Sequence, residues 1–443
     1  MKLFNSLSGK KEEFIPVQKN KLSLYVCGPT VYNYIHIGNA RPVIFFDVLR
    51  RYFEFLGYEV TYTSNVTDVD DKIIQRAIQE STTEKDIAEK YIKAFFEDVE
   101  HSGSLKPHVI PRATEYIEQM IKFIGNLVET NHAYVKDGDV YFRVSSIPNY
   151  GILSNQNTDD LEVGARITDH DKKESPLDFT LWKKTDVGIK WDSPWGKGRP
   201  GWHTECVVMI DSIFGGKIDI HGGGVDLKFP HHENEIAQCE ALHDHTIANY
   251  FMHVGRVSLN SEKMSKSIGN VVWLKDLLKN HKANAYRMLL LSSNYRQPLN
   301  FSDDLMAQFD RDYEKIERSY RSAFLKLDLE DAFTNQVDEE IINCFKNNMD
   351  DDFNTPNVIT ILFELTKKIN TAIRNKEPIG KYFETLKVIL NTLGMEIHME
   401  RLSKEDKELY NAWNEARINK DFEKADSLRK ILSEKGIIWA TKS

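Results

Sequence analysis

Two strand-like segments flank a helical one near the N-terminus, and this order constrains the fold more than any other feature. Residues 21–27 alternate apolar and polar side chains and stop at Gly28-Pro29, which is typical of a strand ended by a turn. From about Ala40 the apolar positions recur at helical spacing until Gly57, where a helix would end. Residues 59–66 alternate again. Strand, helix and strand in this order predict a parallel α/β unit.

The predicted secondary structure changes at two points further along the chain. Between about 100 and 200, a helical segment (114–129) is followed by short strand-like pieces (139–144 and 177–184), which predicts an insertion into the α/β domain. Strand patterns resume at 217–224 and 250–259. From about residue 280 the pattern is almost wholly helical, as in a helical bundle.

Charge and cysteine content exclude several classes of protein. The net charge of -9 argues against diffuse nucleic-acid binding, although a local basic patch could still bind RNA. Residues 401–443 carry 10 basic and 8 acidic side chains, a weak indication of a polyanionic partner. The apolar runs are far shorter than the ~20 residues of a membrane span. Four scattered cysteines do not make a disulfide framework, which fits a reducing compartment. Together with the short apolar runs, this predicts a cytoplasmic protein without signal peptide or membrane association.

Two separated motifs indicate a nucleotide site. His36-Ile37-Gly38-Asn39 lies where the first strand gives way to the helix, and a helix N-terminus beside an imidazole suits phosphate. Lys263 and Lys266, within the string KMSKS, could bring two ammonium groups to one polyphosphate. Each motif alone also fits an ordinary structural role, as a turn histidine or a solvated loop. The two together, in this order and at long separation, are a strong signal.

The residues alone give only a weak indication of a metal site. His231 and Glu235 are four residues apart and would share one helix face if Pro230 begins a helix. No CxxC motif is present. Other side chains are rival ligands on spacing alone: His221, His232, Glu233, Cys239, His243 and His245.

Several segments together resemble one family. The chain is similar over essentially its whole length to the cysteinyl-tRNA synthetases, which are class I aminoacyl-tRNA synthetases with HIGH and KMSKS signatures. The segments that carry the resemblance are YVCGPTVYNYIHIGNAR, NVTDVDDKI, GRPGWHTEC, DIHGGGVDLKFPHHENEIAQ and EKMSKSIGN. One departure is Asn39, which stands where the signature has its second histidine. Asparagine donates a hydrogen bond without charge, so the nucleotide role of this position is weaker here.

The resemblance implies a domain organisation. It indicates a Rossmann-type parallel-sheet catalytic domain, interrupted by a connective insertion and followed by an α-helical bundle and a small C-terminal domain. The expected limits are 1–100 and 200–300 for the catalytic domain with its KMSKS loop, 101–199 for the insertion, 301–400 for the tRNA-binding bundle and 401–443 for a short anticodon-binding region.

The resemblance also implies an activity. L-cysteine would be activated with ATP, aided by Mg²⁺, to cysteinyl-adenylate and then transferred to the 3′-terminal adenosine of tRNA(Cys). The implied catalytic residues are His36, Lys263 and Lys266, and the implied ATP-binding residues are His36, Gly38, Asn39 and Lys266. For substrate binding, the resemblance favours Thr67 near the amino acid. Trp202, four residues before Cys206, could form a wall of the pocket, and His221, which precedes three glycines, could contact the substrate carboxylate or the adenylate.

A zinc site follows from the same resemblance. Its ligands would be Cys27, Cys206, His231 and Glu235, with one ion per subunit, and the ion would select the cysteine thiolate over the serine hydroxyl. We therefore expect no editing site. We also expect a monomer, and we expect the two remaining cysteines, Cys239 and Cys344, to be buried apolar fillers.

Two other functions are kept as alternatives. A cysteine ligase acting on a small-molecule amine, of the mycothiol-pathway type, would share the zinc site and both motifs but would lack an anticodon module; residues 401–443 argue against it. A non-catalytic RNA-binding relative is disfavoured because His36, Lys263 and Lys266 are all present.

Overall fold

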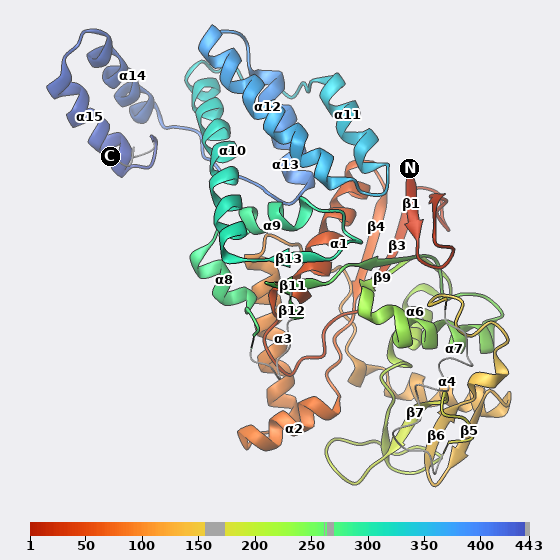
Figure 1. Ribbon diagram of the computed structural model, residues 1–443. Coiled ribbons are helices and arrows are strands. Elements are labelled where there is room, and N and C mark those ends of the chain that lie inside the picture. The colour runs from red at the N-terminus through yellow and green to blue at the C-terminus, as the bar shows by residue number, and fades with distance from the viewer. Residues whose placement is uncertain (156–172, 261, 264–269, 439–443) are drawn as a thin grey trace. The chain divides into compact units, whose positions relative to one another are not determined.

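A four-stranded parallel sheet forms the centre of the N-terminal half (Figure 1). The computed structural model describes residues 1–155, 173–260, 262–263 and 270–438. The strands lie in the order β10 (Ala248–Val254), β9 (Ile218–Gly224), β3 (Lys21–Val26) and β4 (Glu59–Ser64). Every pairing in this sheet is parallel. The predicted parallel α/β unit is therefore confirmed.

Helix α1 (Ile37–Phe55) connects β3 to β4. The apolar positions predicted to form its inner face are buried, among them Ile44, Val48 and Leu49, and each such side chain contributes about 1.5–3 kcal/mol when removed from water. The helix begins three residues earlier than predicted, because His36 caps its N-terminus.

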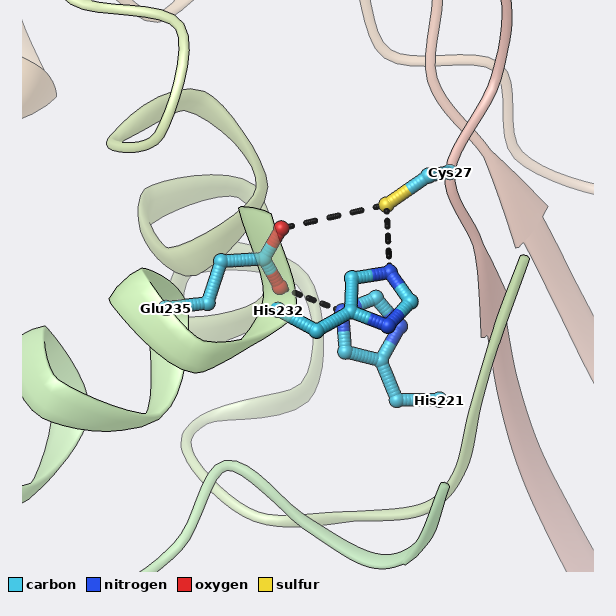
Figure 2. A group of neighbouring side chains, drawn as sticks. All are labelled: Cys27, His221, His232 and Glu235. Atoms are coloured by element: carbon cyan, nitrogen blue, oxygen red, sulfur yellow. Dashed lines mark hydrogen bonds and ion pairs between the residues drawn. The ribbon is translucent and has the colours of Figure 1, made fainter. Parts of the chain in front are cut away.

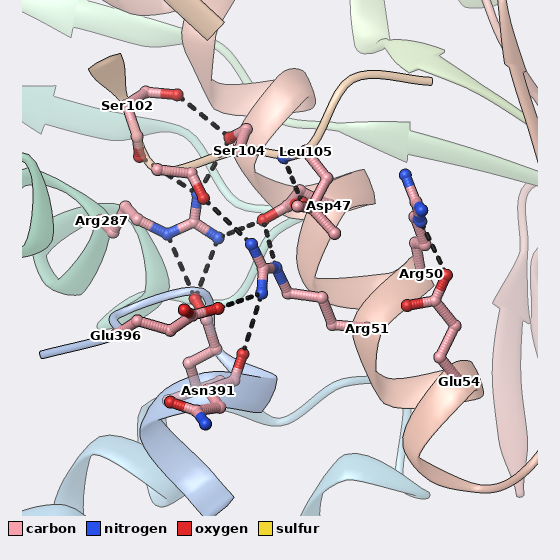
Figure 3. Close-up of polar contacts among 12 residues, drawn as sticks. Asp47, Arg50, Arg51, Glu54, Ser102, Ser104, Leu105, Arg287, Asn391 and Glu396 are labelled. Carbon is pink, nitrogen blue, oxygen red and sulfur yellow. Dashed lines mark hydrogen bonds and ion pairs between the residues drawn. The ribbon is translucent and has the colours of Figure 1, made fainter. Parts of the chain in front are cut away.

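A buried ion pair fixes the middle of α1 (Figure 3). Arg287, on helix α9 (Ala283–Leu291), is fully buried and donates to Asp47 Oδ2 at 2.5 Å. Its other four N–H groups donate to Ser102, to Ser104 and twice to the carbonyl of Leu393. All five guanidinium donors are therefore satisfied inside the protein, which is the condition for a buried charge to be tolerated.

The insertion is built on an antiparallel sheet. Its strands are β5 (Ala133–Lys136), β6 (Asp139–Phe142), β7 (Phe179–Lys184) and β8 (Gly198–Pro200), in that order across the sheet. Helix α4 (Ile117–Glu129) precedes them, as predicted. Phe142 on β6 and Phe179 on β7 stack with ring centroids 4.9 Å apart, so these two neighbouring strands contribute to the same apolar core.

The segment 250–259 was predicted to be one strand, and this prediction was wrong. The chain leaves β10 at Val254 and re-forms as β11 (Val257–Leu259), which belongs to a different sheet together with β12 (Glu262–Lys263) and β13 (Leu299–Phe301). The break lies at Gly255, whose N–H donates to Tyr295 O. A Cβ at this position would lie 2.4 Å from Gln297 O, so the close approach of the two backbones requires glycine.

The remaining elements surround the sheet or continue the chain as helices. The N-terminal hairpin is formed by β1 (Lys2–Asn5) and β2 (Lys10–Glu13). The described part of the first 300 residues also contains the α-helices α2 (Asp71–Glu80), α3 (Glu84–His101), α6 (Glu205–Phe214), α7 (Glu233–His243) and α8 (Leu274–Asn280). The helices that follow are α10 (Asp303–Leu329), α11 (Glu339–Met349), α12 (Thr355–Asn375), α13 (Gly380–Thr392), α14 (Lys404–Ile418) and α15 (Phe422–Glu434). The mainly helical C-terminal part is thus confirmed.

The chain packs as two compact units. The first comprises Met1–Tyr313, Asn343–Ile361 and Leu390–Glu396, and the second comprises Glu314–Ile342, Leu362–Ile389 and Ile397–Ser443. No helix among the described residues has the length and apolar character needed to cross a membrane.

Candidate metal and nucleotide site

The predicted metal ligands come together around the carboxyl ends of the parallel strands, where open α/β sheets bind ligands. Cys27 directly follows β3, Cys206 lies in the first turn of α6, and Glu235 lies in the first turn of α7. His231 belongs to the irregular turn before α7. Helix α7 begins at Glu233, whereas the spacing of His231 and Glu235 predicted a helix that begins at Pro230. Gly28 allows the strand ends to approach closely, since a Cβ there would lie 1.6 Å from Asn65 O.

Among the described residues, two groups of side chains could hold a metal ion, and Cys27, Cys206, His231 and Glu235 form one of them. All four ligand atoms lie within 4.8 Å of one another. The two sulfur atoms are 3.6 Å apart, and Cys206 Sγ is 3.7 Å from His231 Nε2. Glu235 Oε1 lies 2.8 Å from His231 Nε2 and 3.8 Å from Cys27 Sγ. Two thiols, an imidazole and a carboxylate are a donor set that suits zinc.

The second group shares two residues with the first. It consists of Cys27, His221, His232 and Glu235, which Figure 2 shows together. His232 Nε2 lies 3.3 Å from Cys27 Sγ, and His221 Nε2 contacts Glu235 Oε2. The rival ligands Glu233, Cys239, His243 and His245 belong to neither group; Glu233, for example, accepts hydrogen bonds from the backbone of Gly151–Ser154.

The contacts of Glu235 and His231 favour the first group. Glu235 directs Oε1 toward Cys27 and His231, while His221 occupies Oε2. His231 directs Nε2 toward Cys206, and its Nδ1 lies 3.0 Å from His203 Nδ1. Metal ligands in proteins usually make such a second hydrogen bond, which fixes their orientation. In this reading His221 and His232 support the ligands from outside.

Burial and mutual interaction shift the ionisation of the four groups. The hydrogen bond from Cys27 lowers the pKa of the Cys206 thiol to about 6, and His231 acts in the same direction. Burial alone would lower the pKa of His231, but the Glu235 carboxylate and Cys206 raise it to about 10. The pKa of Glu235 falls well below its usual value because His221 and His231 outweigh the effect of burial. Burial, together with Cys206, raises the pKa of the Cys27 thiol well above its usual value. The anionic donors that attract a cation are therefore Cys206 and Glu235.

Trp202 forms one wall of this cluster. Its ring stacks on His231 with centroids 4.1 Å apart, and the side chain is 41% exposed. The indole therefore lies between a candidate ligand and solvent. His221, by contrast, is fully buried, and the prediction that it contacts the substrate stays a prediction.

The hydroxyl of Thr67 donates to a buried carboxyl group, that of the residue before Cys206. The acceptor is Glu205 Oε2, at 2.7 Å. Burial raises the pKa of Glu205 well above its usual value. Asn65 joins the same network, since it donates to Thr67 and accepts from the N–H of Gly28.

Sequence reasoning missed Asn65, His203, Glu205 and His253 as members of the site. Glu205 could have been predicted from the sequence, because this residue directly precedes the candidate ligand Cys206. Asn65 and His203 lie within the segments NVTDVDDKI and GRPGWHTEC, but only the fold shows that their side chains reach the site. His253 lies in none of the quoted segments.

The HIGN motif begins helix α1. Nδ1 of His36 accepts hydrogen bonds from the N–H groups of Gly38 (3.0 Å) and Asn39 (3.3 Å). His36 therefore caps the helix through these two amides, and the ATP-binding role of Gly38 and Asn39 stays a prediction. Because Nδ1 is the acceptor, a neutral ring carries its proton on Nε2. The side chain of Asn39 is exposed.

Residues 272–274, which follow the KMSKS motif, contact the backbone around the HIGN motif. His36 and Trp273 form an antiparallel bridge. The N–H of Ile37 donates to Val272 O, and the N–H of Leu274 donates to Ile35 O. The backbone of Lys263 pairs with Ser258 in β12 and β11, whereas Lys266 lies outside the described residues. The two predicted motifs are therefore joined through their flanks.

Comparison with known proteins identifies the family. The family described as tRNA synthetases class I (C) catalytic domain matches residues 13–311, and the DALR domain family matches residues 344–398. A cysteine–tRNA ligase of Acholeplasma laidlawii is 51% identical over 438 residues, which cover 99% of this chain and 100% of the relative. The chain belongs to the cysteine–tRNA ligases. A second member, from Geobacillus thermodenitrificans, is 46% identical over 450 residues, covering 99% of this chain and 96% of the relative.

The fold of this ligase is that of class I synthetases. A Mycobacterium tuberculosis methionyl-tRNA synthetase in complex with methionyl-adenylate aligns with a TM-score of 0.60 at 14% identity, covering 84% of this chain and 89% of that one. A LeuRS–tRNA–LeuAMS complex from Agrobacterium radiobacter K84 gives a TM-score of 0.60 at 12% identity, covering 86% and 84%. The predicted fold class is confirmed.

Two cysteines of the ligase lie outside the site, and the sequence prediction held for one of them. Cys239 is 4% exposed in the apolar core, as expected. Cys344 was predicted to be a buried filler, and this was wrong, because it is exposed on α11. A single cysteine carries no periodic signal that would reveal which helix face it occupies.

Proposed function

We propose that this chain joins L-cysteine to ATP as cysteinyl-adenylate, with release of pyrophosphate, and passes the cysteine to the 3′-terminal adenosine of tRNA(Cys). Two observations support the proposal. The chain is 51% identical to a cysteine–tRNA ligase over 438 residues, and a donor set with two thiols lies at the carboxyl ends of the parallel strands. No covalent nucleophile is required, because positioning and charge stabilisation are enough for such a transfer.

Cys27, Cys206, His231 and Glu235 would hold a single zinc ion. The fit is chemical: the donor set is mixed sulfur, nitrogen and oxygen, and it is largely buried. When bound, zinc would favour the sulfur of cysteine over the hydroxyl of serine, because a thiol loses its proton far more readily. Thr67, Trp202 and His221 would shape the cysteine pocket around these ligands.

The nucleotide would lie at the start of α1. With Nδ1 of His36 accepting from the helix, Nε2–H is the group that would donate to a phosphate oxygen, next to Gly38 and Asn39. Lys263 and Lys266 would meet the departing pyrophosphate, and Mg²⁺ would accompany ATP.

The helical region would bind the RNA. The match of residues 344–398 to the DALR domain supports this role for the predicted bundle at 301–400. The predicted anticodon region, 401–443, forms a hairpin of α14 and α15 that exposes Ile418 and Phe422, each 72% exposed. The catalytic region would be 1–100 with 200–300, and the insertion 101–199. We also propose a monomer that acts in the cytoplasm.

Transfer of labelled cysteine onto total transfer RNA tests the proposal. With ATP present, we expect labelling by cysteine and none by serine supplied in parallel. Cysteine-dependent ATP–pyrophosphate exchange without any labelled RNA would instead point to a cysteine ligase acting on a small amine.

A further inference from the structure

A line of hydrogen bonds runs from the N-terminal hairpin to Cys27. Ser6 Oγ lies 2.8 Å from His253 Nδ1, His253 Nε2 lies 2.9 Å from His232 Nδ1, and His232 Nε2 lies 3.3 Å from Cys27 Sγ. His232 is fully buried, His253 is 5% exposed, and Ser6 is half-buried. The line joins four parts of the sequence, and both nitrogens of each imidazole take part in it.

Three further contacts keep these groups in place. The N–H of Ser6 donates to Phe251 O, so the hairpin is tied to β10, the strand that carries His253. The ring of His232 stacks on His221 with centroids 4.2 Å apart. A Cβ at Gly223 would lie 3.3 Å from His232, so the backbone passes close beside the ring.

The chemistry of the terminal atom fixes the direction of this line. Cysteine binds a metal as the thiolate, which can accept a hydrogen bond but has no proton to donate. His232 Nε2 must then donate to Cys27, which leaves His232 Nδ1 as an acceptor. His253 must therefore donate through Nε2 and accept through Nδ1, and only the hydroxyl of Ser6 remains to supply that proton. Each of the four groups is satisfied in this direction.

We propose that Ser6 and His253 are positioning residues that keep His232 as a hydrogen-bond donor to the Cys27 thiolate, and so tune this thiolate as a metal ligand. The proposal rests on the zinc site proposed above. A hydrogen bond to sulfur withdraws charge from it, so Cys27 donates less to the ion, and the ion attracts the substrate sulfur more strongly. Specificity for cysteine would thus depend on a serine outside the ligand set.

Cobalt binding to the metal-stripped, full-length protein tests this inference. Co²⁺ bound by thiolate gives a sulfur-to-metal charge-transfer band whose energy falls when a hydrogen bond to sulfur is lost. His253→Leu removes the donor to His232, whereas His253→Gln offers an amide N–H at a similar position. We expect the band to move to longer wavelength in His253→Leu and to lie near the wild-type wavelength in His253→Gln. In ATP–pyrophosphate exchange, KM for cysteine should rise roughly tenfold in His253→Leu with kcat little changed.

Ser6 provides a second pair that is safer for folding. Ser6→Ala should shift the band in the same direction by a smaller amount, and Ser6→Thr, which keeps the hydroxyl, should restore it. These substitutions leave the backbone bond to Phe251 in place.

The outcomes separate this inference from the zinc proposal. No charge-transfer band in the wild-type protein would overturn the zinc site itself. A normal wild-type band with no shift in His253→Leu or Ser6→Ala would overturn only the positioning role. Equal shifts in His253→Leu and His253→Gln would do the same, since they would indicate packing rather than hydrogen bonding.

Discussion

Single side chains in this ligase depend on partners that lie far away in the sequence. Cys206 is the clearest example: it lies 179 residues from Cys27, yet the hydrogen bond between them lowers its pKa to about 6. The chemistry of each residue follows from its type. Its ionisation and its usefulness as a ligand follow from the neighbours that the fold supplies.

Replacing Cys206 with serine tests the choice between the two ligand groups. If the group with both cysteines holds the ion, Cys206→Ser should lose zinc and cysteine activation together, because it removes one of the four ligands. Zinc content by atomic absorption and ATP–pyrophosphate exchange measure the two effects.

Cys344→Ser is the matched control, because Cys344 is exposed and should change neither quantity. Full zinc content in Cys206→Ser would instead favour the group formed by Cys27, His221, His232 and Glu235.

Asp98 on α3 predicts a pH dependence of stability. It is 3% exposed, and its Oδ2 has no hydrogen-bond partner among the described residues. Burial raises its pKa to about 6, whereas an unfolded aspartate titrates near 3.9. The folded state therefore binds more protons between these values, and the free energy of unfolding should fall as pH rises from about 4 to 6.

We expect Asp98→Asn to remove this fall, which amounts to roughly 2 kcal/mol. Urea unfolding at several pH values measures it, with Glu97→Gln, an exposed neighbour on the same helix, as control. Parallel pH profiles for wild type and Asp98→Asn would show that the buried carboxyl is not the cause.

At the scale of elements, α1 is the part of the fold that connects packing to the site. His36 caps its first turn, and the ion pair of Asp47 with Arg287 fixes its middle (Figure 3). Gly394 is required beside this pair, because its φ is +67° and a Cβ would lie 2.1 Å from Arg287 Nη2. Helix α1 is therefore held by the cap at its first turn and by the ion pair at its middle.

His36→Asn should separate capping from catalysis. Asparagine is a good N-cap residue, so the melting temperature should change little, whereas a missing phosphate donor should lower the rate of adenylate formation roughly 10²–10³-fold. His36→Ala should lower both. An unchanged exchange rate in His36→Asn would assign the histidine a capping role only.

Arg287→Met should destabilise the protein by about 3–5 kcal/mol, because it leaves Asp47 buried without its main partner. Chemical unfolding measures the loss. Glu54→Gln breaks the neighbouring pair with Arg50, in which Glu54 is 37% exposed, and should cost no more than about 0.5 kcal/mol. Similar losses in the two variants would mean that burial does not set the value of these pairs.

At the scale of the whole molecule, the two reactions place different demands on the chain. In the proposed function, cysteine activation would require the residues around the parallel sheet, whereas transfer to RNA would also require a surface that contacts the RNA. In the second compact unit, Asp328 accepts from the N–H of Leu402 and forms an ion pair with Lys407, which anchors the start of the α14–α15 hairpin within that unit.

Phe422→Ala, at the exposed turn of this hairpin, should affect only the second reaction. We expect KM for tRNA to rise roughly tenfold, since base stacking on an aromatic ring contributes ~1–3 kcal/mol, while ATP–pyrophosphate exchange stays unchanged. Ile78→Ala, also exposed, is the control. An unchanged KM for tRNA in Phe422→Ala would remove this turn from the proposed RNA surface.

The sequence by itself determined the features that repeat locally or match a motif. The alternation at 21–27 and 59–66 and the helical spacing between them predicted the parallel unit, because side-chain periodicity directly reflects strand and helix geometry. The HIGN and KMSKS strings, with the segments around them, were sufficient to indicate the family.

Only the tertiary structure decided which polar side chains meet. It placed His203, Glu205 and His253 around the cysteines, divided the predicted strand 250–259 at Gly255, and exposed Cys344. Such contacts join residues far apart in the chain, and they depend on how closely two backbones approach and on which groups share the buried space. A linear pattern carries neither quantity, so these features had to be read from the fold.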